Sequence, residues 1–176
     1  MKTFQLIIIL LFKTLWCQVS VKQCQSSARR ELELVNFRMQ EKAIHTPGKA
    51  TISFCIKSSK LLDGKIDLIL QLQKKVFGFW VEIPCDNSIG SCTYKDVCSL
   101  IPFKESCPRQ FGDKPCKCPV PEGEYCVNDL ELSIPKIDHS MVEGKYEIVA
   151  KLKDSEKEIG CLKSEFQIIK TPHTEL

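Results

Sequence analysis

Lys49-Ala-Thr-Ile-Ser-Phe-Cys-Ile-Lys57 alternates apolar and polar side chains along its whole length. Successive side chains of a β-strand point to opposite faces, so Ile52, Phe54 and Ile56 share one face. The other face carries Cys55 among polar neighbours. This period of two predicts a strand that is wet on one side and packs against a second sheet on the other.

The same alternation recurs on both sides of this stretch. It is clearest over Lys65–Gln73, Val76–Ile83, Lys145–Lys153 and Cys161–Lys170, and weaker over Leu32–Met39 and Leu130–Ile134. Turn signals separate the runs: Thr46-Pro-Gly48, Leu62-Asp-Gly64, Glu122-Gly123 and Glu143-Gly144. No long helical pattern occurs, and Asp96–Ile101 allows one or two turns of helix. About seven short strands with this spacing predict an all-β, immunoglobulin-like sandwich of two antiparallel sheets.

The N-terminal segment has the pattern of a signal peptide. Lys2 supplies a positive charge, and the apolar run Leu6–Phe12 follows it. This run is too short to span a bilayer, which takes about 20 apolar residues. We therefore predict a signal peptide over residues 1–20, cleaved within about 17–20, a single domain over 21–170 and a flexible tail over 171–176. The alternative is that the apolar run forms a buried N-terminal strand.

The charge balance does not favour nucleic acid as a partner. The sequence has 25 basic and 22 acidic residues. Without Lys2 and Lys13, which leave with the signal peptide, 23 basic residues remain and the net charge falls from +3 to +1. Nucleic-acid-binding domains usually carry a strong basic excess.

The cysteines predict a disulfide framework. Of the 11 cysteines, Cys17 lies in the predicted signal peptide, and an even ten remain. An even number in an exported chain is typical of disulfides, and the six cysteines between Cys85 and Cys118 indicate a loop-rich, bridged insert. The alternative is a zinc site around Cys107, Cys116 and Cys118, but these lack a paired C-x-x-C spacing. We expect no metal and no cofactor.

The sequence carries no recognisable catalytic motif. The histidines His45, His139 and His173 lie in or beside turns or the tail, outside any nucleophile elbow or metalloprotease helix. Glu122 and Glu124 flank a glycine and leave a glycosidase pair open, although exposed turn acids are the favoured interpretation. We therefore predict a protein that is not an enzyme, with a small secreted hydrolase as the rival.

Several blocks keep the order and nearly the spacing of a known family from about Cys24 to Ile169. They are Gly78-Phe-Trp-Val-Glu-Ile-Pro-Cys85, Ile89-Gly-Ser-Cys-Thr93 with Cys98, Cys107-Pro108, Pro115-Cys-Lys-Cys-Pro119, Glu122-Gly-Glu-Tyr125, Gly144-Lys-Tyr146 and Gly160-Cys-Leu162. This array resembles the ML-domain lipid-recognition family, and within it the ganglioside activators. The resemblance implies a two-sheet sandwich opened into a lipid-binding cup and stapled by disulfides.

The resemblance also implies a function. The cup takes the ceramide tails of a glycosphingolipid, lifts the lipid from an anionic membrane surface and presents its sugars to a lysosomal beta-hexosaminidase. Moving an acyl chain into water costs about 0.8 kcal/mol per methylene, so only an apolar cavity offsets the extraction. The alternatives are a secreted carrier or sensor of another lipid (sterol, fatty acid or phospholipid) without a hydrolase partner, and a bridged module that binds protein only.

The pairing of the cysteines follows from the resemblance. It implies the bridges Cys24–Cys161, Cys85–Cys92, Cys98–Cys118 and Cys107–Cys116. Cys55 and Cys126 are extra to the family pattern and are left to pair with each other. Because Cys55 faces away from Ile52, Phe54 and Ile56, this fifth bridge should lie on an outer surface.

The expected location is the exterior or the lysosomal lumen. Asn36, Asn87 and Asn128 all lack the hydroxyl residue two positions on that a glycosylation site needs. Glycan-dependent routing to lysosomes is therefore doubtful, and plain secretion gains weight.

Two sets of residues are candidates for contact with lipid. Periodicity alone favours a filled core, whereas the resemblance favours a cavity wall made of Ile52, Phe54, Ile56, Leu68, Leu70, Phe79, Val81, Ile83, Tyr146 and Ile148. Trp80 falls on the face opposite Phe79 and Val81, which suits a bilayer interface or a Trp covered by a neighbouring loop. We predict a membrane contact made by Lys74, Lys75, Phe77 and Trp80, with about 1 kcal/mol from each lysine at an anionic surface.

Overall fold

The structure is a computed structural model. It describes residues 19–24, 31–63, 65–100, 107, 109–111, 116–134, 136 and 143–171. The predicted signal peptide, apart from Val19 and Ser20, lies outside these ranges, as does the predicted tail after Thr171. No helix within the described ranges is long and apolar enough to cross a membrane.

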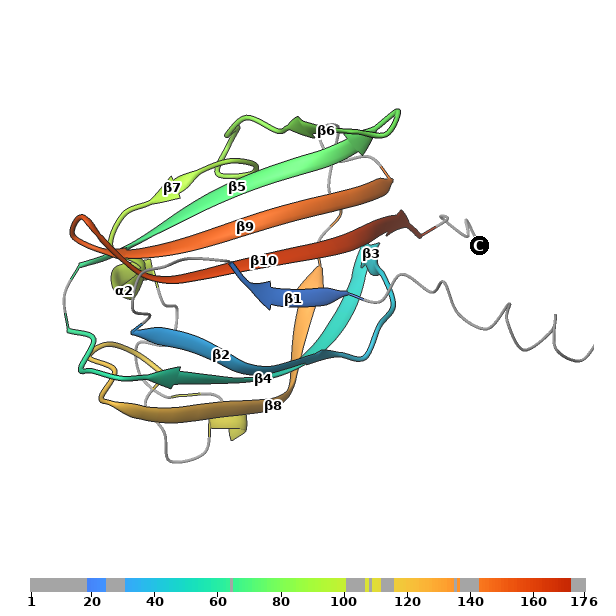
Figure 1. Ribbon diagram of the computed structural model, residues 1–176. Helices are drawn as coiled ribbons and strands as arrows, with labels where there is room; N and C mark the ends of the chain where they lie inside the picture. The colour runs from blue at the N-terminus through green and yellow to red at the C-terminus, as the bar shows by residue number, and fades with distance from the viewer. Residues whose placement is uncertain are drawn as a thin grey trace, which may run out of the picture.

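The chain folds into two β-sheets that face each other (Figure 1). The large sheet has the order β1 (Ser20–Gln23), β10 (Lys157–Lys170), β9 (Gly144–Asp154), β5 (Ile66–Val76) and β6 (Phe79–Glu82), with β3 (Ile44–Thr46) on β10 and β7 (Thr93–Tyr94) on β5. The small sheet has the order β2 (Leu32–Met39), β4 (Gly48–Ser58) and β8 (Gly123–Ile134). Among these named strands, every pairing is antiparallel except that of β3 with β10, which is parallel. The predicted all-β, two-sheet fold is confirmed.

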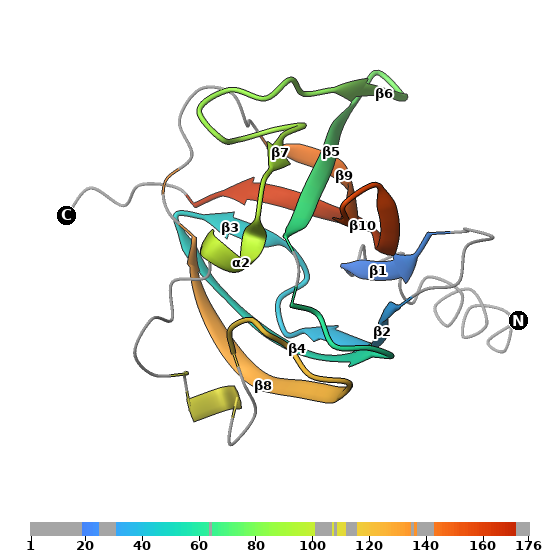
Figure 2. The ribbon, with the colours of Figure 1, turned by 90° about the vertical axis from the view of Figure 1, so that its left-hand side faces the viewer.

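The only helical segments in the described ranges are short. They are α2 (Val97–Leu100), where the sequence allowed a turn or two, and a 3-10 turn over Arg109–Phe111. Figures 1 and 2 show α2 at one end of the gap between the two sheets, where Val97 and Cys98 pack against the interior, and the 3-10 turn beside β8.

The segment predicted as one strand over Val76–Ile83 is instead a hairpin. β5 continues to Val76, and β6 begins at Phe79. Phe77 and Gly78 both have positive φ, 47° and 91°, which is the backbone of a tight two-residue hairpin turn. The alternation that suggested one strand therefore spans two strands, and Phe77 does not share a strand face with Phe79.

The interior is filled at two separate places. One cluster is built on Leu72, Tyr146 and Ile168, with Ile44, Ile83, Ile148 and Phe166 packed against it. The other is built on Leu62, Ile66 and Ile159, with Leu32, Val97, Cys98, Val120 and Leu152 packed against it. Ile66 and Leu72 are six residues apart on β5, about 20 Å. The two clusters thus mark opposite ends of the large sheet.

Five disulfides hold the sheets and the insert. They are Cys24–Cys161, Cys55–Cys126, Cys85–Cys92, Cys98–Cys118 and Cys107–Cys116. These are the five pairs expected from the sequence and its family resemblance. Because Cys107, Cys116 and Cys118 all lie in disulfides, none offers a thiolate, and the zinc alternative does not hold.

Candidate functional site: the apolar interior between the sheets

The register of the large sheet lines up apolar side chains on one face. Leu68 lies opposite Leu152, Leu70 opposite Ala150, and Ala150 in turn opposite Leu162. Directly opposite residues of paired strands share a face. All five of these side chains are only half-buried, although they lie in the middle of the sheet. In a packed sandwich such positions are filled, so this face is not covered by the other sheet.

The inner face of the small sheet also carries apolar side chains that are only half-buried. Ile52, Phe54 and Ile56 on β4 are each half-buried. Tyr125 and Val127 on β8, which lie opposite Ile56 and Phe54, are buried. Close packing is therefore confined to part of this sheet, and the side chains of β4 remain accessible from the interior.

A cavity of about 270 Å³ lies where the two faces meet. Its wall consists of Leu32, Glu33, Leu34, Ile56, Leu68, Ala150, Leu152, Gly160, Cys161 and Leu162. The wall is almost entirely apolar and takes residues from both sheets. An apolar cavity of about 150 Å³ is already large enough to stay dry and bind benzene. This cavity is larger and has the chemistry to hold part of an aliphatic chain.

Strand β2 contributes wall residues that the sequence did not single out. Leu32 and Leu34 came from a weakly patterned stretch, and the bulge between Leu34 and Asn36 interrupts the alternation there. A side-chain atom on Gly160 would lie 3.1 Å from the Leu32 carbonyl oxygen, so glycine allows β10 to approach β2 closely. Gln23 Nε2 donates a hydrogen bond of 3.1 Å to the Leu34 carbonyl oxygen and joins β1 to β2 on this side. The cavity is therefore closed where the sheets come together.

The ten predicted wall residues divide into groups. Ile56 and Leu68 line the cavity, and Ile52, Phe54 and Leu70 lie half-buried on inner faces beyond it. The remaining five, Phe79, Val81, Ile83, Tyr146 and Ile148, do not line this cavity, and their contact with lipid stays a prediction.

Tyr146, Ile83 and Ile148 belong to a filled cluster. Tyr146 is fully buried, and its ring stacks on Phe166 with the centroids 5.7 Å apart. Ile83 and Ile148 pack against the same group. The cluster is filled because β3 joins the edge of β10 here and brings Ile44 into it.

Phe79 and Val81 lie on the predicted face but outside any enclosure. Val81 is opposite Lys74, and Phe79 is opposite Val76, on the face that carries Leu72. Their side chains are nevertheless 76% and 49% exposed. The reason is the position of β6, an outer strand of the large sheet that lies far from β2, β4 and β8 in both views (Figures 1 and 2).

The predicted membrane-contact residues cluster at the β5–β6 hairpin. Phe77 at its turn is 98% exposed. Lys75 lies opposite Trp80 on the outer face, with its ammonium 5.5 Å from the centre of the half-buried indole. Lys74 lies on the inner face instead, opposite Tyr146, with its ammonium 5.7 Å from the centre of that ring. The two lysines therefore do not act on the same side of the sheet.

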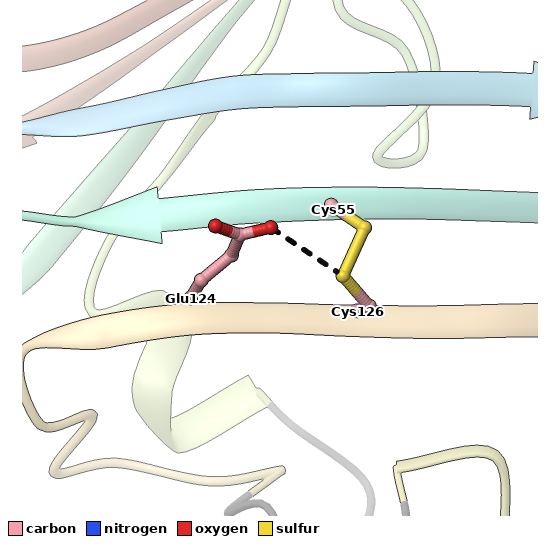
Figure 3. Close-up of side chains that lie close together, drawn as sticks. All are labelled: Cys55, Glu124 and Cys126. Carbon is pink, nitrogen blue, oxygen red and sulfur yellow. Dashed lines mark hydrogen bonds between the residues drawn. A yellow bond between two sulfur atoms is a disulfide. The ribbon is translucent and has the colours of Figure 1, made fainter.

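The fifth disulfide lies on the outer face of the small sheet (Figure 3). Cys55 and Cys126 are directly opposite on β4 and β8, with their Cα atoms 4.1 Å apart. Glu124 Oε1 is 3.8 Å from the Cys126 Sγ. Two cysteines and a carboxylate are a possible set of metal ligands. Both sulfurs are consumed by the disulfide, so this group does not offer thiolates to an ion.

Comparisons with known proteins agree with this architecture. The ML domain model matches residues 18–168. The Ganglioside GM2 activator of Macaca fascicularis is 38% identical over 126 residues, which is 66% of this chain and 66% of that protein. The Mus musculus protein of the same name is 35% identical over 133 residues, 71% of this chain and 69% of that protein. The match thus spans about two thirds of the length of these curated relatives.

Among solved structures, a Niemann-Pick type C2 protein from Japanese carpenter ant is similar, with a TM-score of 0.47 and 14% identity over 85% of this chain and 99% of that chain. The family assignment does not depend on this structure. It follows from the match of the ML domain model to most of the sequence and from the identity to the two activators. The chain belongs to the ML-domain family.

Proposed function

We propose that this protein binds a membrane lipid in its apolar interior, extracts it from the bilayer and presents it to a hydrolase. The observation that carries the proposal is the 270 Å³ cavity between the sheets, together with the half-buried apolar faces around it. Each methylene that leaves the bilayer for water costs about 0.8 kcal/mol. A preformed apolar wall removes that cost for the part of the chain it covers.

The names of the two relatives guide the choice of lipid and partner. Both are ganglioside activators, so we propose a glycosphingolipid as the ligand and a glycosidase, such as a lysosomal beta-hexosaminidase, as the enzyme served. The protein itself is proposed to be non-catalytic. We place it in the secreted fluid or the lysosomal lumen, as the N-terminal pattern and the five disulfides favour an oxidising compartment.

One observation favours a second candidate function. The cavity of about 270 Å³ is less than twice the roughly 150 Å³ that binds benzene, which suits part of one aliphatic chain. A carrier of a single-chain lipid or a sterol, without a hydrolase partner, fits this enclosed volume. A ceramide, in contrast, needs the open face around Leu70 and Phe54 as well as the cavity.

The proposed route from the membrane starts at the β5–β6 hairpin. Val76, Phe77 and Phe79 expose apolar surface there, and Trp80 and Lys75 lie beside them on the outer face. Exposed aromatic side chains next to a cation are suited to a bilayer interface with anionic lipids. We propose that this hairpin docks on the membrane and the lipid enters from that end.

The deciding experiment is extraction of the purified protein with organic solvent, followed by mass spectrometry and a transfer assay. The transfer assay uses vesicles that contain a fluorescent glycosphingolipid, with and without beta-hexosaminidase. Co-purified lipid, transfer and faster hydrolysis support the full proposal. Transfer without any effect on hydrolysis supports the carrier function. A lipid-free extract together with no transfer of sphingolipid, sterol or fatty acid overturns both.

A further inference from the structure

Two adjacent lysines of β5, Lys74 and Lys75, point to opposite faces of the large sheet. Lys75 is opposite Trp80, on the outer face. Lys74 is opposite Tyr146 on one side and Val81 on the other, and all three lie on the inner face that carries the buried Leu72. Lys74 is thus a cation on the inner, apolar face of the sheet that forms the lipid site.

The Lys74 side chain is held over apolar groups. Its ammonium lies 5.7 Å from the centre of the Tyr146 ring, and the side chain is half-buried. A side-chain atom on Gly144 would lie 3.0 Å from the Lys74 Cε, so glycine at this position leaves the space that the lysine occupies. Tyr146 and Gly144 together define the position of the ammonium at the end of the interior that adjoins the exposed hairpin.

No carboxylate neutralises this ammonium within the described part of the chain. Other lysines do have such partners: Lys163 Nζ on β10 is 2.7 Å from Glu147 Oε2, and Lys95, which follows β7, pairs with Asp67. Glu143, which precedes Gly144 at the start of β9, accepts a hydrogen bond from the backbone N–H of Lys170. A half-buried cation over an aromatic ring retains its attraction for an anion that arrives with a ligand.

The position of Lys74 also fits the length of a lipid. From Lys74 to Leu68 in the cavity wall is six residues along β5, about 20 Å. An acyl chain extends over about half of the roughly 30 Å hydrocarbon core of a bilayer, or about 15 Å. Leu70 lies half-buried on the same face between the two places, and beyond it the surface of the filled Leu72–Tyr146–Ile168 cluster leads to Lys74. A chain of about 15 Å that ends at Leu68 stops about 5 Å short of Lys74, so its polar group lies toward the ammonium.

We propose that Lys74 recognises an anionic group on the bound lipid and makes the protein prefer anionic over neutral lipids of the same tails. This inference rests on the proposed lipid-binding function and adds a specificity-determining residue to it. The recognised group is a carboxylate or phosphate whose oxygen accepts hydrogen bonds from the Lys74 ammonium. The source is a sialic acid on a glycosphingolipid or the phosphate of a phosphosphingolipid.

The chain offers a matched control, because Lys74→Gln and Lys75→Gln remove the same charge from neighbouring residues on opposite faces. Donor vesicles are made of neutral phosphatidylcholine, so that docking to an anionic membrane does not contribute. They carry one of three ligands with identical ceramide tails: a sialylated glycosphingolipid, its asialo counterpart, or ceramide phosphate. The readout is the ratio of anionic to neutral lipid transferred, with the melting temperature of each variant measured alongside.

The wild type and Lys75→Gln are expected to prefer the anionic ligand by roughly three- to tenfold, the range of a partly exposed charge-assisted contact. Lys74→Gln is expected to bring the ratio close to one while neutral transfer continues, and Lys74→Arg to keep the preference. Added salt should weaken the wild-type preference. A preference for only one of the two anions identifies the source of the recognised group.

Two outcomes overturn the inference, and they differ from failure of the proposed function. If the wild type shows no anionic preference, or if Lys74→Gln and Lys75→Gln keep the same preference, Lys74 does not recognise the anion. If none of the three ligands is transferred by the wild type, the proposed function itself fails. If Lys74→Gln lowers the melting temperature severely, the inference is tested by Lys74→Arg and by salt instead. A lost preference in Lys74→Arg, or a wild-type preference that salt does not weaken, then overturns it.

Discussion

Lys60 Nζ lies 2.8 Å from Glu31 Oε2 and 2.9 Å from Asp154 Oδ2. Lys157 contacts the other oxygen of the same glutamate, whose side chain is only 13% exposed. The backbone is joined at the same place, because the Glu31 N–H donates to the Ile159 carbonyl at 3.0 Å. This group links the start of β2 to the β9–β10 hairpin, directly beside the cavity wall formed by Leu32 and Gly160.

This group predicts a specific dependence of stability on pH. Hydrogen bonds from Lys157 and Lys60 lower the pKa of Glu31 below its usual value. A carboxyl whose pKa is depressed on folding contributes stability above its unfolded pKa, near 4.3, and loses it as pH falls through the folded value. We expect Glu31→Gln to melt about 2–4 °C below wild type between pH 5 and 9, and the difference to shrink below pH 4.

The matched control for this change is Glu131→Gln. Glu131 pairs with Lys49 at 2.7 Å, but both side chains are more than half exposed, so little stability depends on the pair. Thermal unfolding at a series of pH values tests both variants. An equal effect of the two substitutions at neutral pH would contradict a special role of Glu31.

Filling the cavity should block lipid without loss of the fold. Ala150 lies in the cavity wall, and the cavity exceeds the roughly 150 Å³ that accommodates benzene. We expect Ala150→Phe to reduce the bound lipid and its transfer by more than half, with a melting temperature equal to or above wild type. Val149→Phe, on the opposite face of the same strand, is the control. The cavity interpretation fails if Ala150→Phe carries as much lipid as wild type.

The exposed turn of the β5–β6 hairpin should determine attachment to membranes. Phe77 is 98% exposed and has a positive φ, a backbone conformation that asparagine tolerates well. We expect Phe77→Asn to weaken binding to phosphatidylserine-containing vesicles by roughly ten- to a hundredfold, since burial of one aromatic side chain is worth about 1.5–3 kcal/mol. The blue shift of Trp80 fluorescence on adding vesicles reports the binding.

Val35→Asn is the matched control for the hairpin, because Val35 is 55% exposed on β2, away from it. This variant should bind vesicles as wild type does. Equal vesicle binding by wild type and Phe77→Asn would show that the hairpin does not dock.

The fifth disulfide should stabilise the fold without taking part in lipid binding. Cys55 and Cys126 are separated by 71 residues in sequence and lie on the outer face of the small sheet. Opening a loop of this length typically costs about 2–4 kcal/mol of unfolding free energy. We expect the double variant Cys55→Ala, Cys126→Ala to show that loss in denaturant titration, with lipid transfer retained at temperatures where it is folded. Lost transfer in the folded variant would place the bridge in the lipid site.

Much of the architecture was predictable from local pattern. The alternation in Lys49–Lys57 predicts that Cys55 and Ile56 point to different faces of one strand. In the structure this strand is β4, and Cys55 lies on the outer face. The five cysteine pairs follow from the family resemblance and the two cysteines left over. The hairpin at Phe77 was missed because alternation continues across the turn, and only the positive φ values of two residues reverse the chain there.

The sequence by itself determined which face of each strand is apolar, because side-chain direction in a strand depends only on the period of two. It did not determine which apolar side chains fill the core and which line a cavity. Leu68 and Tyr146 look alike in their strands, yet one lines the cavity and the other is fully buried. Only the tertiary structure decides this, because the spacing between the sheets depends on contacts far apart in sequence, such as Ile44 beside β10 and Gly160 against Leu32.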